Sequence, residues 1–261
     1  MQKLSKLPIS ALILAKNEQD MIEGCLKQLN FVDEIIVLNQ SSQDNTANIA
    51  RRYDAKILDS KIEDFAHNRN ILAKAAKNNW LLYLDCDERL TDVNIKEIEE
   101  SMKDNSFSVY YFPRKNFILG HFSKHGGWWP DYVPRLFKAA DLVAWEGEVH
   151  ESPKIKDKIG YMHNPIIHYT ARTISLMLTK TIKWAEIEAN LRFQAGQKEV
   201  KIANIAKTMT FEFINRYFAK LGFLDGRFGL IQSLFQALHQ AAVLTYLWEK
   251  QHNFSKKEFY A

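Results

Sequence analysis

The sequence predicts an α/β fold with a mostly parallel sheet, followed by a helical C-terminal region. Four short apolar runs indicate strands over residues 9–14, 34–38, 55–58 and 80–84. Segments with apolar residues at helical spacing separate these runs, and strands that alternate with helices form parallel sheets. After residue 92, short strands and aromatic residues predominate up to about residue 169, and three long helical patterns then follow.

Each apolar run is followed by a signal for a loop or a helix. Asn17 opens a helical stretch after the first strand, and further helices are expected over residues 46–53 and 65–78. The run Trp80–Leu84 does not alternate between apolar and polar residues, so this strand is expected to be buried on both faces. Sheets of this kind bind ligands beyond the carboxyl ends of their strands. The polar residues that follow each strand are therefore the candidates for a site.

Length and composition allow a sizeable core. The chain has 261 residues, of which 46% are hydrophobic, and needs neither a disulfide nor a metal to fold. We expect a sheet domain over residues 1–170 and a helical region over residues 171–261. The helices of this region are expected over about residues 173–196, 199–219 and 228–250. The cysteines Cys25 and Cys86 form no framework of the secreted type, and the N-terminus has no signal-peptide pattern, so a cytoplasmic protein is predicted.

The C-terminal region carries the positive charge of the chain. After Thr170 there are 13 basic and 7 acidic residues, without a nucleic-acid-binding motif, which favours contact with an anionic membrane surface over nucleic acid. The stretch Phe228–Leu247 contains no charged residue, but its polar and apolar residues fall on opposite sides of a helix. The polar residues are Gln232, Gln236, His239 and Gln240. This pattern predicts a helix that packs on the domain or lies in a bilayer interface, and not one that spans the bilayer.

An acidic motif, Asp85-Cys86-Asp87, directly follows the fourth predicted strand. Two carboxylates one residue apart at a strand end reach the same crevice, and carboxylate oxygens suit Mg²⁺ or Mn²⁺. Asp-x-Asp is a common tripeptide, and a solvated acidic turn or a cap for the helix near Asp92 is the alternative interpretation. Its place at the end of a buried strand favours a functional site.

Polar residues at the ends of the first three strand–helix units complete this candidate site. Asn17 and Asp44 are placed to hydrogen-bond a base and a ribose, although each is equally suited to cap a helix. Arg69 lies near the start of the third predicted helix. It is placed to meet a diphosphate or to pair with an acidic residue.

These motifs, in this order and at this spacing, resemble family 2 glycosyltransferases. They are Leu14–Glu18, Glu34–Thr46, Asn68–Asn70 and Leu84–Glu88. Later segments are similar to the branch that builds lipopolysaccharide core and related surface glycans, so the resemblance covers nearly the whole chain. These segments are Pro113–Arg114, His125–Tyr132, Arg135–Phe137, Val149–Glu151 and Gly222–Gly226.

The resemblance implies a GT-A fold, a Rossmann-like mixed and mostly parallel sheet that binds a nucleoside-diphosphate sugar. The donor-binding residues it implies are Ala15, Asn17, Glu18, Asp44, Arg69, Asp85 and Cys86. Asp85 would lie toward the ribose and sugar, and Asp87 would coordinate a divalent metal on the diphosphate. The family usually has Asp where this chain has Asn39, which puts the nucleotide selection in doubt.

The implied reaction is an inverting transfer of a hexose-type sugar, with a uridine nucleotide favoured, to a hydroxyl of a glycan or glycolipid acceptor such as lipopolysaccharide core. A base on the far face of the sugar would remove the proton of the acceptor. Glu151 is the candidate base, Asp131 is the second candidate, and His150 is a candidate metal ligand by analogy. Trp128 and Trp129 would stack on an acceptor sugar or belong to the core. The remaining histidines near strands, His163 and His168, are expected to be structural.

Three alternatives remain open. A phosphatase of the haloacid dehalogenase type places Asp-x-Asp after its first strand and continues it to Thr, whereas this chain has it after the fourth strand, followed by Glu88-Arg89. A nucleotidyltransferase would have a glycine-rich N-terminal loop, and residues 15–18 contain no glycine. A catalytically impaired nucleotide-sugar-binding or scaffold protein is the third, because Asn39 departs from the family pattern.

Overall fold

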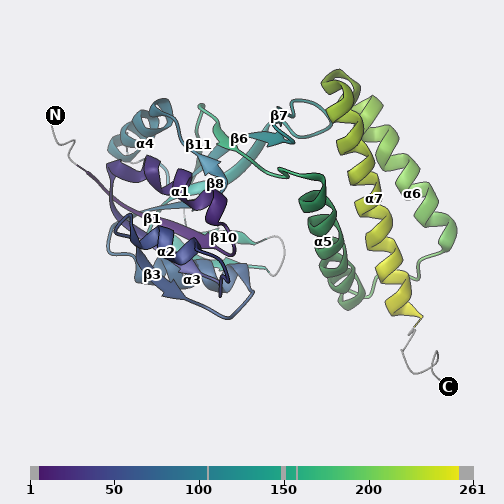
Figure 1. Cartoon of the computed structure of the whole chain (residues 1–261), viewed down its shortest axis with the longest axis horizontal. Coiled ribbons are helices and arrows are strands. Elements are labelled where there is room, and N and C mark those ends of the chain that lie inside the picture. Colours follow the sequence, from purple (N-terminus) through teal and green to yellow (C-terminus); the bar gives the residue numbers. More distant parts are fainter. Residues whose placement is uncertain (1–5, 105, 148–150, 157, 253–261) are drawn as a thin grey trace. The chain divides into compact units, whose positions relative to one another are not determined.

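The computed structural model describes residues 6–104, 106–147, 151–156 and 158–252. The chain divides into two compact units (Figure 1). The first unit runs up to Lys115 and includes Asp131–His168, and the second comprises Asn116–Pro130 and the chain from Tyr169 onward. That residues 171–261 form a domain of their own stays a prediction.

A single mixed sheet organises the first unit. Its parallel part has the order β3–β2–β1–β4, and the four predicted strands are confirmed. Their bounds are Leu7–Ala15 (β1), Val32–Asn39 (β2), Lys56–Asp59 (β3) and Trp80–Asp85 (β4). Ile13 of β1 lies opposite Val37 of β2 and Leu84 of β4, so the three strands end at the same edge. That edge holds the loops with the predicted donor-binding residues.

The sheet continues beyond β4 with strands of mixed direction. The order is β4–β8–β6–β12–β5, and β8 is antiparallel to both β4 and β6. Their bounds are Glu88–Arg89 (β5), Val109–Ile118 (β6), Asp131–Lys138 (β8) and Ile166–His168 (β12). Two further short strands pair with β6, namely His121–Phe122 (β7) and Ile159–Tyr161 (β11), and Leu142–Glu146 (β9) forms a hairpin with Ser152–Ile155 (β10).

Helices cover both faces of the sheet, as its apolar strands require. The helices of this unit are Gln19–Lys27 (α1), Thr46–Arg51 (α2), Phe65–Ala75 (α3) and Asp92–Asp104 (α4). One core cluster joins Ile13 of β1 to residues of α1, α2 and α4, and the other joins Leu12 of β1 to Leu72 of α3 and Trp145 of β9. Because neighbouring residues of β1 belong to opposite clusters, the strand is buried on both faces. The predicted fold class is confirmed.

Up to residue 252, where the described part of the chain ends, the second unit contains three long helices, and all three were predicted. They are Ile174–Gln194 (α5), Ile202–Ile214 (α6) and Gly226–Gln251 (α7), with a π-helical turn Asn215–Ala219 (η2) and a 3₁₀ turn Gly222–Asp225 (η3) before α7. Helices α5 and α6 both pack on α7. A Cβ atom at Gly229 would lie 1.8 Å from the carbonyl oxygen of Gly222, so this close approach requires glycine.

The polar side of the uncharged stretch in α7 turns partly inward. Gln232 is buried and donates to the Ser123 hydroxyl over 2.6 Å, while Leu234 and Leu238 are exposed. The carboxylate of Asp225 accepts the backbone N–H groups of Lys124 and His125, which ties the 116–130 loop to the helices within this unit. No helix in the described ranges combines the length and apolar character that crossing a membrane requires.

Candidate functional site

Hydrogen bonds between backbone and side chains join the loops after β1 and β2. The Asn17 side-chain oxygen accepts the N–H of Gln43 over 2.8 Å, and the N–H of Asn17 donates to the Ser42 hydroxyl over 3.0 Å. Asn17 has a positive φ of 54°, which Asn tolerates better than most residues. The carbonyl oxygen of Ala15 accepts the N–H of Gln40. Asn17 therefore fixes the distance between the two loops at the sheet edge.

Asp44 links the starts of α1 and α2. Its carboxylate accepts the N–H of Gln19 over 3.1 Å and the N–H of Thr46 over 3.0 Å, and Glu18 donates its N–H to the Thr46 hydroxyl. Burial opposes the charge on Asp44, but the hydrogen bonds from Thr46 and Gln19 outweigh it and hold the pKa of this carboxyl below its usual value. These contacts match the capping interpretation of Asp44, and its donor-binding role stays a prediction.

Asn39, which stands where the family usually has Asp, is held at the sheet edge by hydrogen bonds of its side chain. Its side-chain N–H donates to the Asp59 carboxylate over 2.8 Å, and its side-chain oxygen accepts the N–H of Ser42 over 3.2 Å. A carboxylate at position 39 has no N–H to offer, so it would face the Asp59 carboxylate directly. The negative charge of this corner is therefore carried by Asp59.

Seven charged side chains form a continuous series of ion pairs beside the end of β4. We call this series the arginine–carboxylate chain; acids and arginines alternate along it in the order Glu151, Arg69, Asp85, Arg135, Glu88, Arg114 and Asp131. Both candidate bases are its end members. The structure thus brings Glu151, Asp131, Arg69 and Asp85 into one network, although they lie on different elements.

The first part of the arginine–carboxylate chain centres on Arg69 of α3. Its guanidinium lies 3.2 Å from Glu151 and 3.4 Å from Asp85, and its carbon lies 4.7 Å from the centre of the Trp145 ring. Burial alone would raise the pKa of Asp85, but the guanidinium groups of Arg135 and Arg69 hold it well below the usual range. Asp85 is therefore ionised at neutral pH, and its position is fixed by two cations.

The second part of the arginine–carboxylate chain is buried and centres on Glu88. This carboxylate is fully buried and accepts two hydrogen bonds from Arg135, over 2.6 and 2.8 Å, and the N–H of Asp85 over 3.2 Å. Arg114 lies 3.5 Å from Glu88 and 2.7 Å from Asp131. A charge that is buried so completely persists only when it is paired in this way. Glu88 thus fixes the loop that carries the Asp-x-Asp motif.

The other two motif residues face different surroundings. Asp87 lies 3.5 Å from the imidazole of His168 in β12, and about a fifth of its side chain is exposed. Cys86 points into the core, with its sulfur 3.6 Å from the carbonyl oxygen of Leu14, and burial raises the pKa of its thiol. Cys86 is therefore a neutral core thiol, and Asp87 is the motif carboxylate that contacts His168.

The chemistry of Asp87 fits a divalent ion. Within the described residues no three His, Cys, Asp or Glu side chains form a ready metal cage. Mg²⁺ sites on diphosphates need only one or two protein carboxylates, because phosphate oxygens and water supply the other ligands. Asp87 meets this requirement. The predicted ligand His150 lies outside the described residues.

The predicted acceptor residues belong to the second unit. The Trp128 ring lies 5.9 Å from the guanidinium carbon of Arg216, and the Trp129 ring packs edge-on against Phe122 with centroids 5.8 Å apart. Both tryptophans are half-buried. Their contacts in this unit are those of partly packed side chains, and an acceptor role stays a prediction.

Sequence reasoning assigned no catalytic or binding role to four residues that the structure brings to the site. They are Glu88, Arg114, Arg135 and His168. His168 was expected to be structural, and it contacts Asp87. His163, its counterpart in that expectation, is exposed and pairs with Glu97. One signal was available, because Arg135 stands directly before the apolar Leu136 and Phe137 in β8, where an unpaired charge is costly.

Comparisons with known proteins show the family of this chain. The sequence model of the family described as Glycosyl transferase family 2 matches residues 10–180. An uncharacterized glycosyltransferase of Rickettsia bellii is 24% identical over 90% of this chain and 84% of its own length. The lipopolysaccharide core biosynthesis glycosyltransferase LpsC of Rhizobium meliloti is 22% identical over 90% of each chain.

The fold also resembles a solved structure over nearly its full length. The crystal structure of S. aureus TarS 1-349 in complex with UDP-GlcNAc aligns with a TM-score of 0.50 and 14% identity. The alignment covers 95% of this chain and 91% of that chain. At this identity the likeness bears on the fold alone, which is the GT-A type implied by the sequence.

Proposed function

Because the chain belongs to glycosyl transferase family 2 and is a glycosyltransferase, we propose that it transfers a hexose-type sugar from a uridine-diphosphate donor with inversion at the anomeric carbon. The observation that carries the proposal is the common edge of β1, β2 and β4. There, Asn17, Asp44 and the Asp85–Asp87 motif follow strands that end side by side. This is the position at which parallel sheets bind nucleotides.

In this proposal the loops after β1 and β2 bind the nucleoside. The loop around Asn17 and Glu18 supplies backbone and amide groups, and Asp59 supplies the negative charge near the base that Asn39 lacks. Asp85 lies toward the ribose and sugar, held by Arg69 and Arg135. A site whose groups are already fixed loses little conformational entropy when the donor binds.

Asp87 would hold a divalent ion, Mg²⁺ or Mn²⁺, on the diphosphate. When bound, the ion neutralises the charge that develops on the leaving nucleoside diphosphate. His168 contacts the Asp87 carboxylate and orients it. Ala15 and Cys86 contribute through the backbone, since the side chain of Cys86 points into the core.

Glu151 is the proposed base that takes the proton of the acceptor hydroxyl. Its carboxylate shares Arg69 with Asp85, so it lies on the same network as the proposed sugar-binding acid. Asp131, at the other end of the arginine–carboxylate chain, is the alternative base. Removal of the proton from the face opposite the leaving group gives inversion.

For the acceptor, we propose a hydroxyl of a cell-surface glycan precursor such as lipopolysaccharide core, with Trp128 and Trp129 as contacts to its sugars. The support for this choice is the similarity to LpsC, whose name assigns it to lipopolysaccharide core biosynthesis. Aromatic rings provide an apolar surface for the faces of sugars.

A thermal-shift screen of nucleotide sugars tests the donor assignment. The purified chain is heated with UDP-, GDP-, dTDP- and ADP-hexoses, each with Mn²⁺ or with a chelator. We expect stabilisation by UDP-sugars with Mn²⁺, reaching about 2.7 kcal/mol at 100 times the dissociation constant. Equal responses to all four nucleotides, or none to any, would contradict the proposal. Binding without transfer to any acceptor would favour the catalytically impaired protein instead.

A further inference from the structure

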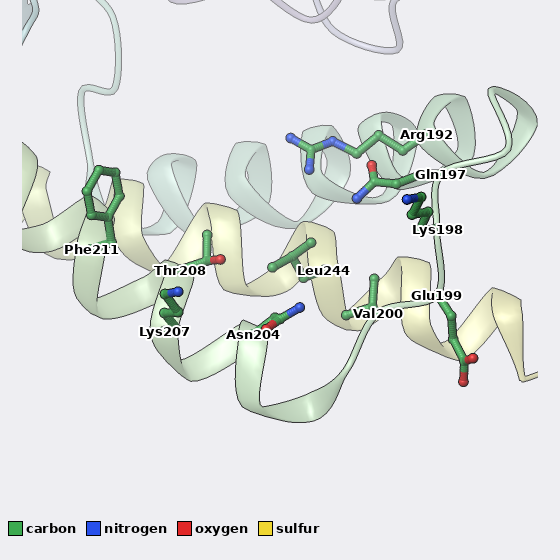
Figure 2. A pocket seen from close by; sticks show the side chains of 10 residues that line it. All are labelled: Arg192, Gln197, Lys198, Glu199, Val200, Asn204, Lys207, Thr208, Phe211 and Leu244. Atoms are coloured by element: carbon green, nitrogen blue, oxygen red, sulfur yellow. The ribbon is translucent and has the colours of Figure 1, made fainter.

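The second unit contains a groove between α5 and α6. Both helices pack on α7 and make few contacts with each other, and the segment 197–200 that connects them lines the groove. The resulting cavity has a volume of about 520 Å³, within the usual size range of ligand pockets (Figure 2). This groove lies wholly within the helical unit and is no part of the proposed donor site.

The groove has an apolar floor and a cationic rim. Val200 and Leu244 form the floor and are buried, and Phe211 closes one end (Figure 2). The rim carries Arg192, Lys198 and Lys207 against one acidic residue, Glu199. Glu199 lies 3.3 Å from His252, and Arg192 pairs with Glu188 over 2.6 Å. An amphipathic anion, with an apolar body and a charged group at one end, matches this lining.

The two lysines of the rim are available to a ligand. Within the ranges that the structure describes, neither Lys198 nor Lys207 forms an ion pair, and both are exposed. Asn204 and Thr208 lie near Lys207 on α6 and add hydrogen-bonding groups. Ammonium groups of this kind bind phosphate oxygens as mobile point charges.

An exposed apolar stripe adjoins the groove along α6 and η2. Phe211, Ile214 and Phe218 follow one another at intervals of three and four residues, which places them on one side of the helix. Their exposed fractions are 66%, 50% and 54%. Lys207 lies one turn before Phe211 on the same side. Large exposed apolar stripes on a helix with flanking basic residues are typical of helices that lie in a membrane interface.

We propose that this face docks on the surface of an anionic membrane. The rim of the groove would bind the phosphate of an anionic phospholipid, its acyl chain would lie against Val200 and Leu244, and Phe211 and Phe218 would enter the boundary between headgroups and chains. The charge excess after Thr170 supports this occupant, because basic residues near an anionic leaflet are attracted to it. The surface differs from the α7 face that the sequence indicated, and the inference is independent of the donor chemistry.

Sedimentation with vesicles tests the proposal. Full-length protein is mixed with phosphatidylcholine vesicles that contain or lack phosphatidylglycerol, at low and at high salt. We expect partitioning onto the phosphatidylglycerol vesicles that is at least tenfold stronger and that weakens at high salt. The variant Lys198→Ala/Lys207→Ala should bind the phosphatidylglycerol vesicles roughly 30-fold more weakly. The reason is that each basic residue near such a surface strengthens binding about fivefold. Phe211→Asp should weaken vesicle binding at least as much as the loss of one lysine does.

Matched variants in the first unit separate this site from general charge attraction. Lys96→Ala/Lys158→Ala removes two exposed lysines, and Val93→Asp alters a residue with 54% exposure. Both should bind vesicles as the parent protein does. Equal losses in the two lysine pairs, no vesicle binding at all, or an α6-dependent dimer in sedimentation velocity would overturn the proposal. Stabilisation of Lys198→Ala/Lys207→Ala by UDP-sugars should be unchanged, so failure here leaves the donor site untouched.

Discussion

Two regions of the same sheet edge are built in different ways. The loops after β1 and β2 are joined mainly through backbone N–H groups, as in the bonds of Asn17 and Asp44. The loop after β4 is held by buried side-chain charges, with Glu88 and Arg135 at their centre. Losing one hydrogen bond to a backbone N–H group costs little stability, whereas losing the partner of a buried charge costs much more. The loop after β4 is therefore more sensitive to the loss of a single partner than the loops after β1 and β2.

The largest expected effect is on stability, from Arg135→Met. It leaves Glu88 fully buried without its main partner, and loss of one member of a buried pair costs about 3–5 kcal/mol. Urea unfolding at pH 7 measures the loss. The exposed Arg52→Met is the control and should change the free energy of unfolding by less than about 0.5 kcal/mol. A loss below about 1 kcal/mol for Arg135→Met would refute the idea that buried charge holds this loop.

The pH dependence sharpens this test. The pKa of Asp85 is depressed by Arg135 and Arg69, so its contribution to stability is present above the unfolded-state pKa of about 3.9. That contribution is lost as the pH falls through the folded-state value. The gap in unfolding free energy between the parent and Arg135→Met should therefore shrink below about pH 4. A gap independent of pH would indicate lost packing instead of lost charge pairing.

The next effect concerns the two ends of the arginine–carboxylate chain. Glu151→Gln keeps the shape of the side chain but removes the base, so transfer should fall about 100-fold while calorimetry finds donor binding nearly unchanged. Asp131→Asn should reduce transfer only severalfold. If the two results are exchanged, Asp131 is the base; if neither variant is slowed, the proton is removed by another group.

Asn39→Asp probes the hydrogen-bonded side of the edge and should have a smaller effect. It replaces the N–H that bonds Asp59 by a second carboxylate, which should cost about 1–3 kcal/mol at pH 7. The cost should diminish toward pH 4, where the new carboxyl takes up a proton. Asn48→Asp makes the same replacement at an exposed position and serves as the control in thermal unfolding. Equal stability of the two variants would show that Asn39 is not a fitted part of the edge.

Asp44→Ala should have the smallest effect, about 1 kcal/mol of stability, as for the loss of a helix cap. Asn45→Ala should cost less, because Asn45 precedes α2 but makes no side-chain cap bond. Chemical denaturation distinguishes them. A tenfold or greater loss of UDP-sugar affinity for Asp44→Ala would support its predicted donor-binding role, and unchanged affinity would show that Asp44 only joins the two helices.

The parallel half of the fold was predictable from sequence for a local reason. The apolar runs of β1, β2 and β4 and the helical spacing after each of them are properties of short segments, and the Asp-x-Asp motif follows directly from the end of β4. The placement of Asp85 and Asp87 at the common edge needed only the rule for parallel sheets.

The arginine–carboxylate chain was not predictable in the same way. Its members are up to 82 residues apart in a single contact, that of Arg69 with Glu151, and depend on the order in which β8 and β6 join the sheet. The sequence shows which residues are charged, but it does not show which of them form ion pairs with one another. The apolar side of α7 in the sequence pattern also did not predict which residues are buried, because Gln232 is buried and Leu234 is exposed.

Titration calorimetry of a UDP-sugar tests the central claim, that Asp87 holds a metal ion on a diphosphate at this edge. In the parent protein, Mn²⁺ should tighten UDP-sugar binding at least tenfold. In Asp87→Ala, which leaves the buried pair of Glu88 and Arg135 in place, Mn²⁺ should give no gain. An undiminished gain from Mn²⁺ in Asp87→Ala would contradict the account.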